Sequence, residues 1–345
     1  MKKTKRIHLI VAIVVLFITI AAIIGGFGYY LFLYPNFAAP KTIYIYIYPE
    51  KNFEHLCRQL KDSANCLNIN SFVEVAKLLK YPENMKTGRY AVNPRINNYT
   101  LLNNLRRGQQ EPVKLTFNNI RFKADLSDRL SEQLMITSQE LNSLLDDASY
   151  CESLGFTPAT VITMFIPNTY EVYWNISAEK LIERMKREYG VFWNENRLNQ
   201  AQRAGLSPLE ISILASIVEE ESAVADEYPT IAGLYINRLH RGIPLQADPT
   251  IKYALGNFAI QRILYEHLRI DSPYNTYLYT GLPPGPLRIP SPKGLESVLN
   301  YQKHNYLYMC AKEDFSGRHN FAVTFAEHNR NADRYRAELN RRGIR

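Results

Sequence analysis

The longest hydrophobic stretch of the chain lies at its start. Residues 7–34 contain no Asp, Glu, Lys or Arg, and the segment 9–24 is almost entirely aliphatic. An α-helix needs about 20 apolar residues to span the hydrocarbon core of a membrane. Tyrosines gather at the far end of the stretch, as they do where a helix meets the lipid headgroups. The pattern therefore predicts a transmembrane helix over residues 7–34.

Positive charge on one side of this stretch predicts its orientation. Four basic residues stand within residues 1–6, and such residues stay on the cytoplasmic side of a membrane helix. We therefore expect residues 1–6 to form a cytoplasmic tail and the chain from residue 41 onward to lie outside the cytoplasmic membrane. The alternative is a cleaved signal peptide, whose apolar region is shorter and ends in a small-x-small cleavage site. The segment Gly25–Gly28 fits such a site poorly, which favours an uncleaved anchor.

A second pattern begins after the hydrophobic stretch. Residues 43–48 alternate Ile and Tyr, which predicts a strand with Ile on one face and Tyr on the other. Short helical and strand-like patterns follow at 53–60, 71–79, 86–92 and 101–107. We expect a compact strand–helix–helix–strand module over residues 41–110. It contains no cluster of acids and bases, so its expected role is binding or spacing.

From residue 111 onward, helical segments mix with strand-like and aromatic ones. The strand-like segment is 113–122, the helical ones are 126–147 and 178–204, and residues 156–173 are aromatic and irregular. This mixture predicts the α+β class for a second domain over residues 111–345. The whole chain is thus predicted to be a transmembrane helix, a small α/β module and a mixed α+β domain.

The clearest helix start in the second domain is at Ser207. Ser207 is suited to the N-cap, Pro208 to the first helical position and Glu210 to the third, which together form a capping box. The helix that they open is apolar and ends in three consecutive glutamates, residues 219–221. Three glutamates at a helix end are also typical of a solvated, charged terminus, so the chemistry depends on where each one points.

The helical wheel singles out Glu219 among the three glutamates. At 100° per residue, Ile211, Leu214, Ile217 and Val218 share one apolar stripe, and Glu221 would point into it. Glu219 projects away from that stripe, over small residues at i−4 and i−7 that leave room for a ligand. Neighbouring carboxylates and an apolar surround both raise a carboxyl pKa, which suits a general acid. Glu219 is therefore the predicted acid.

Three later segments are typical of a carbohydrate site. Residues 245–250 present an amide, a carboxylate and a hydroxyl on one turn, residues 272–277 add tyrosines to that mixture, and residues 281–286 form a rigid Pro/Gly loop. Aromatic faces pack on the C–H faces of sugar rings, while amides and hydroxyls bind sugar hydroxyls. The same Asp and Asn residues, beside prolines, are equally suited to Asx turns that bind no ligand.

The charge distribution argues against a nucleic-acid-binding protein. The chain of 345 residues has a formal net charge of +8, but four of those charges lie in the N-terminal tail. Residues 330–345 contribute six Arg against two acids, so the body between 41 and 329 is neutral. A nucleic-acid-binding domain carries its positive surplus as a stripe on the folded surface. We therefore expect no nucleic-acid partner.

Cysteine and histidine spacing gives no sign of a metal or a cofactor. The four cysteines are Cys57, Cys66, Cys151 and Cys310, without a zinc-type spacing. Disulfides are permitted outside the membrane, and Cys57 with Cys66 is the close pair; four unpaired thiols are the alternative. His319 and His328 are interpreted as structural histidines. No glycine-rich phosphate loop is present.

Five ordered segments carry a resemblance to a known family. They are Ala215–Glu221, Ile236–Leu239, Leu245–Thr250, Tyr274–Tyr277 and Gly281–Pro286. Together they resemble the MltG-type endolytic murein transglycosylases, also called the YceG-like family, and the resemblance covers essentially the whole chain. It implies that the module of residues 41–110 is LysM-like. One departure stands at Asn168, where many relatives have Asp, and the Glu-Gly pair that precedes it in them is missing.

The resemblance implies a specific activity. It implies cleavage of peptidoglycan glycan strands within the chain, between N-acetylmuramic acid and N-acetylglucosamine, which leaves 1,6-anhydro ends. The catalytic acid would be Glu219, the first acid of the Ile-Val-Glu segment. Coupling to the penicillin-binding machinery that polymerises glycan is also implied, so that new strands are ended near their point of synthesis. The residues expected to hold the sugars are Gln246, Asp248, Tyr274, Asn275 and Tyr277.

The expected mechanism uses one carboxyl group twice. The acid protonates the glycosidic oxygen, and the resulting carboxylate takes the proton of the muramoyl C6 hydroxyl as it closes the anhydro ring. Two alternatives remain. A muramidase would use a second carboxylate, Asp248 or Glu227, beside Glu219 and release reducing ends. A membrane-anchored glycan-binding scaffold would not cleave at all.

Overall fold

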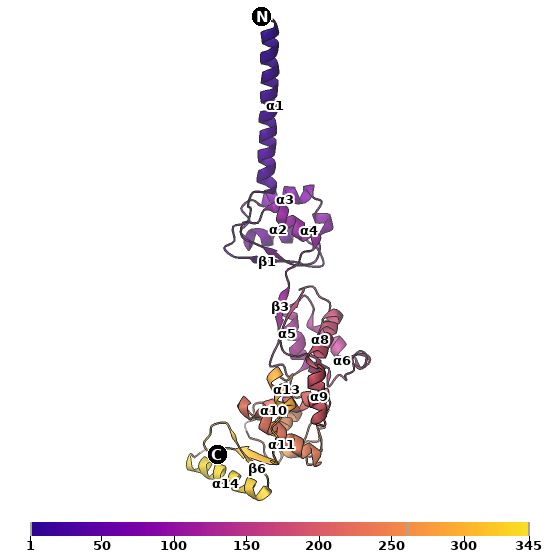
Figure 1. The fold of residues 1–345 in the computed structure, drawn as a ribbon, viewed down its shortest axis with the longest axis vertical. Coiled ribbons are helices and arrows are strands. Elements are labelled where there is room, and N and C mark those ends of the chain that lie inside the picture. Colours follow the sequence, from indigo (N-terminus) through magenta and orange to yellow (C-terminus); the bar gives the residue numbers. More distant parts are fainter. Residues whose placement is uncertain (1, 261, 344–345) are drawn as a thin grey trace. The chain divides into compact units, whose positions relative to one another are not determined.

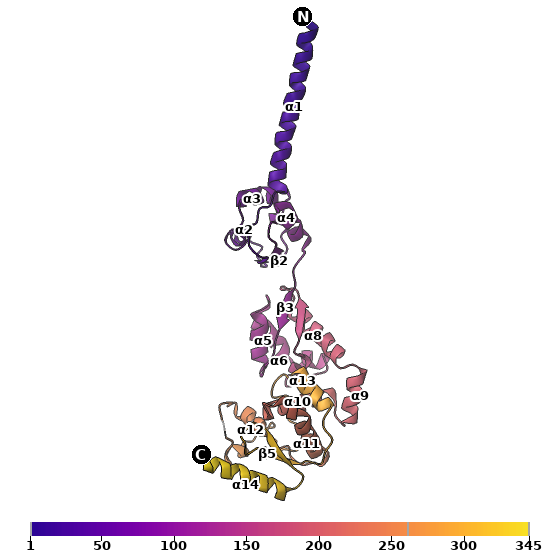
Figure 2. The same ribbon diagram turned by 60° about the vertical axis from the view of Figure 1, so that its left-hand side comes forward.

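The computed structural model describes residues 2–260 and 262–343, and it divides into two compact units. The first unit comprises Met1–Lys114 with Glu171–Ile176, and the second comprises Leu115–Tyr170 with Ser177–Arg345. Met1 of the predicted tail lies outside the described residues. The return of residues 171–176 to the first unit was not indicated by the sequence pattern. Figures 1 and 2 show the elements of each unit.

Helix α1 (Lys2–Phe32) opens the first unit. Within it, Arg6–Phe32 is long and apolar enough to cross a membrane, and none of it is buried in the protein. This agrees with the predicted hydrophobic helix, and the same helix is compatible with either a membrane anchor or a signal sequence. Its last turn contacts the module that follows: the Asn98 amide donates a hydrogen bond of 2.9 Å to the carbonyl of Leu31.

The module of the first unit is a two-stranded sheet with three α-helices. Its elements are β1 (Ile43–Ile47), α2 (Phe53–Asp62), α3 (Ile69–Leu78), the 3₁₀ turn η1 (Pro82–Asn84), β2 (Gly88–Val92) and α4 (Asn98–Arg107). Strands β1 and β2 are antiparallel. As the alternation predicted, Ile45 and Ile47 are buried. Tyr46 and Tyr48 lie on the other face, where both rings pack edge-on against Trp174 from the returning segment at 5.0 Å.

Strands β3 (Val113–Thr116) and β4 (Thr169–Val172) pair with each other. The helices that follow β3 are α5 (Lys123–Ser131), α6 (Ser138–Asp146) and α7 (Ala148–Ser153), with the 3₁₀ turn η2 (Val161–Met164) before β4. The sequence predicted one helix over 126–147, whereas the structure has two. Thr137 begins a new helix with a capping box that includes Glu140, and this interrupts the pattern.

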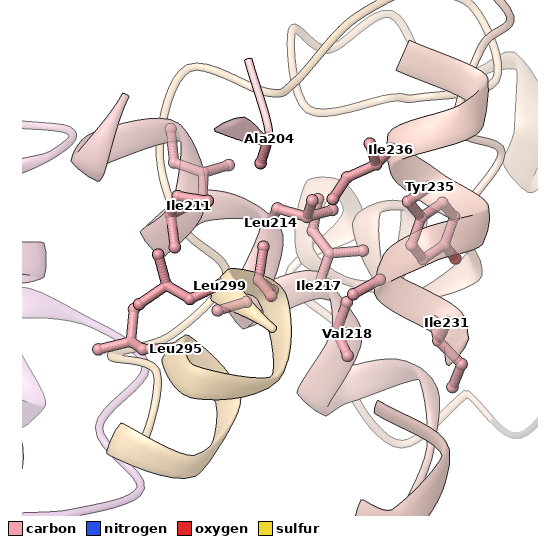
Figure 3. Close-up of a cluster of buried hydrophobic side chains, with 14 of the residues drawn as sticks. Ala204, Ile211, Leu214, Ile217, Val218, Ile231, Tyr235, Ile236, Leu295 and Leu299 are labelled. Carbon is pink, nitrogen blue, oxygen red and sulfur yellow. The ribbon is translucent and has the colours of Figure 1, made fainter. Parts of the chain in front are cut away.

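The core of the second unit is built around α10 (Pro208–Glu221). Before it stand α8 (Ala178–Phe192) and α9 (Glu195–Arg203), which were predicted as one helix; the Asn194 side chain caps the second. After it come η3 (Ala225–Glu227), α11 (Tyr228–His240), α12 (Asp248–Leu255), η4 (His267–Arg269) and α13 (Pro292–Leu299). Figure 3 shows side chains of α10, α11 and α13 meeting in the core, with Leu214 and Ile217 of α10 among them.

The second unit ends in a hairpin and a helix. Strands β5 (Tyr308–Ala311) and β6 (His319–Ala322) are antiparallel, and α14 (Phe325–Arg341) packs against both. In Figure 2, α14 lies beside β5. With three two-stranded sheets among the described residues and many more helices, the fold is mixed α+β, as predicted.

Candidate active site

Helix α10 positions the three glutamates, and it does so through its capped start. The backbone amide of Glu210 bonds to the Ser207 hydroxyl at 3.2 Å, and the Glu210 carboxylate accepts from the Ser207 amide at 2.8 Å. Residues 211–218 of the helix are all buried. A helix that is held at its start and buried along its length presents its last turn rigidly. The predicted capping box is confirmed.

Glu219 is tied to the start of α13. Its two carboxylate oxygens accept from the Ser291 amide at 3.2 and 3.1 Å, and one of them also accepts from the Ser291 hydroxyl. Gly294 lies so close that a Cβ there would stand 2.5 Å from a Glu219 oxygen. Burial raises the pKa of Glu219, while the Ser291 hydrogen bonds act in the opposite direction. Glu219 is therefore a half-buried carboxyl group with a structural partner.

The small residues expected to floor an open groove beside Glu219 are covered in the structure. Ser212 and Ala215, the small residues expected to form its floor, are both fully buried at 0% exposure. Helix α13 packs closely against α10, and its Leu295 and Leu299 reach the α10 core in Figure 3. The small residues make room for a neighbouring helix instead of a ligand. That premise of the Glu219 prediction was wrong.

Glu220 forms ion pairs on another side of the helix. Its carboxylate accepts from Arg121 at 2.7 and 2.8 Å and from Arg288 at 3.0 Å. Two guanidinium groups therefore surround one carboxylate. These charge-assisted hydrogen bonds hold the Glu220 side chain against the two arginines.

Glu221 lines a cavity of about 450 Å³, which we call the main cavity. The buried hydroxyl of Tyr235 donates to its carboxylate at 3.1 Å. Burial, and next the negative charge of Asp248, raise the pKa of Glu221 to about 7. A carboxyl group with this pKa is protonated in a large fraction of molecules at neutral pH. It is therefore suited to donate a proton to a ligand in the cavity.

Three of the predicted sugar-binding residues line the same cavity. Gln246, Asp248 and Tyr277 all contribute to its wall. The Tyr277 hydroxyl donates to Asp248 at 2.5 Å, and Arg238 donates to the Gln246 side-chain oxygen at 3.1 Å. Gln246 has a positive φ of 52°, which is unusual for a residue other than glycine and orients its side chain at the turn. The cavity thus offers amide, carboxylate and phenol groups beside the Glu221 acid.

The other two predicted sugar-binding residues lie elsewhere. Asn275 is fully buried: its amide donates to the carbonyls of Leu268 and Ile270, and its oxygen accepts from the Tyr277 amide at 2.9 Å. It stabilises the turn, as the Asx-turn alternative predicted, and the geometry does not support contact with a sugar. Tyr274 lines a different cavity of about 510 Å³, the second cavity.

Comparison with known proteins identifies the family. The model of the YceG-like family matches residues 45–334. The chain belongs to the YceG-like family. Among solved structures, the crystal structure of a YceG-like protein from Listeria monocytogenes matches with a TM-score of 0.55 and 26% identity, over 85% of this chain and 99% of that one.

Two curated relatives of this YceG-like chain carry the name endolytic murein transglycosylase. The one from Bacillus subtilis is 36% identical over 164 residues, which cover 48% of this chain and 44% of the relative. The one from Streptococcus pneumoniae is 33% identical over 183 residues, which cover 50% of this chain and 32% of the relative. The chain therefore spans less than half the length of these relatives.

A buried carboxylate–imidazole pair in this YceG-like chain was missed by the sequence reasoning. Glu227 is 7% exposed and accepts from both the backbone amide and Nδ1 of His319, each at 3.0 Å. His319 lines the main cavity, and Glu227 does not. Glu227 therefore holds His319 in place and is not free to act as the second carboxylate of a muramidase. Their separation of 92 residues hid the pairing from the sequence.

The cysteines are unpaired, which is the second of the two alternatives that the sequence left open. All four are free thiols, and burial raises the pKa of both Cys57 and Cys66 to about 11. Among residues 2–260 and 262–343, no group of three His, Cys, Asp or Glu side chains is arranged to hold a metal.

Proposed function

We propose that this chain is a membrane-anchored endolytic murein transglycosylase whose catalytic acid is Glu221. The observation that carries the proposal is the main cavity. There a carboxyl group with a pKa of about 7 stands beside Gln246, Asp248 and Tyr277. The name of the two curated relatives and the family membership support the same activity.

The choice of Glu221 changes the acid predicted from the sequence. Glu219 remains a prediction from the motif, but both of its oxygens are hydrogen-bonded to Ser291 at the start of α13. Glu221 has one side-chain partner, Tyr235, and lines the main cavity. A general acid needs access to the glycosidic oxygen as well as a raised pKa. Of the two residues, Glu221 meets both conditions.

The proposed reaction needs one carboxyl group. Protonated Glu221 gives its proton to the glycosidic oxygen as the bond to the muramoyl C1 breaks. The C6 hydroxyl of the same sugar attacks C1, and its proton passes to the Glu221 carboxylate, which restores the acid. Asp248, already an acceptor for the Tyr277 hydroxyl, keeps a negative charge near Glu221 and favours its protonated form. No water enters the reaction.

A matched pair of variants tests the assignment. Full-length chain in detergent is incubated with uncross-linked peptidoglycan strands, and the ends of the products are identified by mass spectrometry. We expect anhydro-muramoyl ends from the unaltered chain, a 10²–10⁴-fold slower reaction for Glu221→Gln, and cleavage within about tenfold of normal for Glu219→Gln. The reverse ranking of the two variants would return the catalytic role to Glu219.

The same product assay separates the muramidase alternative, and one observation favours testing it. Asp248 lines the main cavity with Glu221, and its charge acts on Glu221. It is therefore the candidate for the second carboxylate of a muramidase. A two-carboxylate enzyme adds water at C1 and releases reducing ends. If reducing ends alone are formed, the lyase chemistry is wrong while the Glu221 acid stands.

The proposal also includes the location of the enzyme. Arg6–Phe32 is suited to anchor it, with the basic tail in the cytoplasm and the remaining chain on the wall side. We expect the full-length chain to stay in the membrane fraction after alkaline carbonate extraction, and protease added outside spheroplasts to digest it. A soluble, shortened product would indicate a cleaved signal. The LysM-like nature of the module and the coupling to penicillin-binding machinery stay predictions.

A further inference from the structure

The second cavity has no part in the chemistry proposed above. It has a volume of about 510 Å³ and lies within the second unit. The side chains that the argument uses are Arg121, Phe122, Lys123, Asn142, Tyr253 and Tyr274. They come from α5 and the residues before it, from α6, from α12 and from the turn after η4. Four separate parts of the chain thus converge on one hollow.

One wall of the second cavity is aromatic. The rings of Tyr253 and Tyr274 lie 4.6 Å apart, and the ring of Phe122 lies 5.7 Å from that of Tyr253. Phe122 is 40% exposed, so part of its ring is open to solvent. Flat rings that remain open to solvent offer the faces on which sugar C–H groups pack.

The polar groups around the second cavity favour a ligand with negative charge. Arg121, Lys123 and Asp146 belong to its lining, while Glu220, which pairs with Arg121, and Arg288, which shares Glu220, lie outside the lining. Against these three cations stand two carboxylates, Glu220 and Asp146, the latter paired with Lys123. The group therefore has a surplus of one positive charge. Such a surplus attracts a carboxylate, here through partly exposed groups.

Unused hydrogen-bonding capacity remains in the lining. The Asn142 oxygen accepts from the Ser127 hydroxyl at 2.8 Å, and among the described residues its amide nitrogen has no recorded partner. Within the same part of the chain, Nε of Arg121 is buried without a hydrogen-bond partner. The Asn142 amide is the donor of this lining that suits the carbonyl of an N-acetyl group or of a peptide.

Three short connections join the second cavity to the main one. Helix α12 begins with Asp248 in the main cavity and places Tyr253 in the second, about 7 Å further along its axis. The turn after η4 likewise places Tyr277 in the main cavity and Tyr274 in the second. On α10, Glu221 faces the main cavity while the adjacent Glu220 binds Arg121. The two cavities are therefore neighbours on one rigid frame.

We infer that the second cavity is a binding subsite for peptidoglycan strand away from the scissile bond, and that it takes a sugar whose attached peptide carries free carboxylates. This inference rests on the proposed function. An enzyme that cuts within a strand must hold sugars beyond those that react. The aromatic wall binds the sugar face, and the positive surplus with the Asn142 amide binds the peptide. Neutral chitin oligosaccharides lack that second set of groups.

The test measures binding and cleavage separately. Full-length chain with Glu221→Gln is titrated calorimetrically with long peptide-bearing strands, long peptide-free strands and chitin oligosaccharides. Phe122→Ala and Phe122→Leu remove the open ring face, and Tyr265→Ala is the matched control because Tyr265 is 88% exposed and lines neither cavity. Melting temperatures show that each variant is folded.

We expect both Phe122 variants to weaken binding of peptide-bearing strands about tenfold or more, with Tyr265→Ala unchanged. Peptide-bearing strands should bind more tightly than chitin oligosaccharides, and added salt should reduce that difference. Unchanged affinity in the folded Phe122 variants would overturn the subsite, and equal affinity for chitin would overturn the assigned ligand. Failure of the proposed function would show differently, as absence of cleavage by the chain with Glu221 intact.

Discussion

Glu219 and Glu221 stand two residues apart on the last turn of α10, yet their surroundings differ completely. Glu219 faces the start of α13, where Ser291 donates to both of its oxygens. Glu221 faces the main cavity, where burial and Asp248 raise its pKa to about 7. Successive helical positions rotate by 100°, so a shift of two residues moves a side chain to a different neighbour. The same residue type is thus a structural partner at one position and a candidate acid at the other.

The pH dependence of cleavage distinguishes Glu221 from Glu219 most strongly. The raised pKa means that Glu221 is protonated below pH 7 and ionised above it. A reaction that needs the protonated acid should therefore be near its maximum below pH 7 and fall about tenfold per pH unit well above it. Initial rates of anhydro-end formation from pH 5 to 9, with Tm recorded at each pH, check this. A rate that is flat up to pH 9 would contradict the role of Glu221.

Gly294→Ala perturbs the Glu219 side alone. The added Cβ would stand 2.5 Å from a Glu219 oxygen, so the carboxylate must move away from Ser291. We expect unfolding free energy to fall by about 1–3 kcal/mol, because a partly buried carboxylate loses charge-assisted hydrogen bonds. Cleavage per folded molecule should stay within about threefold of normal, a small loss on the scale of general acid catalysis. Denaturant unfolding and the cleavage assay measure the two quantities, and loss of cleavage without loss of stability would favour Glu219 as the acid.

These two environments also show how far the sequence predicted the site. The capping box of Ser207 and Glu210 is local, and the structure confirms it. The helical wheel gave the direction of Glu219 but not its neighbour, because Ser291 is 72 residues away along the chain. Small residues on a helix face signal close approach, and the wheel does not say whether a helix or a ligand approaches. Here α13 occupies that face.

The same limit of local sequence patterns applies to the other predicted site residues and to strand β1. Asp248, Gln246 and Tyr277 were predicted because amides, carboxylates and phenols gather on short turns, which is a local signal, and all three line the main cavity. Asn275 carries the same signal, and its burial by neighbouring carbonyls could be seen only in three dimensions. The alternation of Ile and Tyr over 43–48 predicted β1 with Ile and Tyr on opposite faces, and in the structure Ile45 and Ile47 are buried. No local pattern predicted that Trp174 would cover its Tyr face.

The pH dependence of the unfolding free energy is a second difference between Glu221 and Glu219. Because the folded-state pKa of Glu221 lies above its usual value of 4.5, the folded state binds the proton more tightly than the unfolded state. The contribution of Glu221 to the unfolding free energy is therefore fully present below about pH 4.5 and is lost as pH rises through 7. Glu221→Gln removes the charge and should raise the unfolding free energy at pH 8 by on the order of 2 kcal/mol relative to the unaltered chain. At pH 5 the difference should be much smaller.

Glu219→Gln is the matched control for that measurement. Its carboxylate is hydrogen-bonded by Ser291, so replacing it by a neutral amide weakens those bonds and should lower stability at both pH values. Thermal unfolding of both variants at pH 5 and 8 gives the four values needed. Because the pKa of Glu219 is also raised, the loss should be smaller at pH 8 than at pH 5. A stabilising effect of Glu219→Gln at both pH values would contradict the hydrogen-bonded role given to Glu219.

Tyr277→Phe changes the surroundings of Glu221 less than Glu221→Gln does. The variant removes the hydroxyl that donates to Asp248 at 2.5 Å and leaves the ring in the cavity wall. Because one hydrogen bond to a charged group contributes about 1.5–3 kcal/mol, and Asp248 can bind water instead through its exposed side, we expect cleavage to fall only about tenfold and Tm to change little. The steady-state rate and the apparent affinity for strands separate a loss of positioning from a loss of binding. If neither the rate nor the affinity changes, Asp248 is held adequately without Tyr277. The hydrogen bond between Tyr277 and Asp248 would then have no role in the reaction.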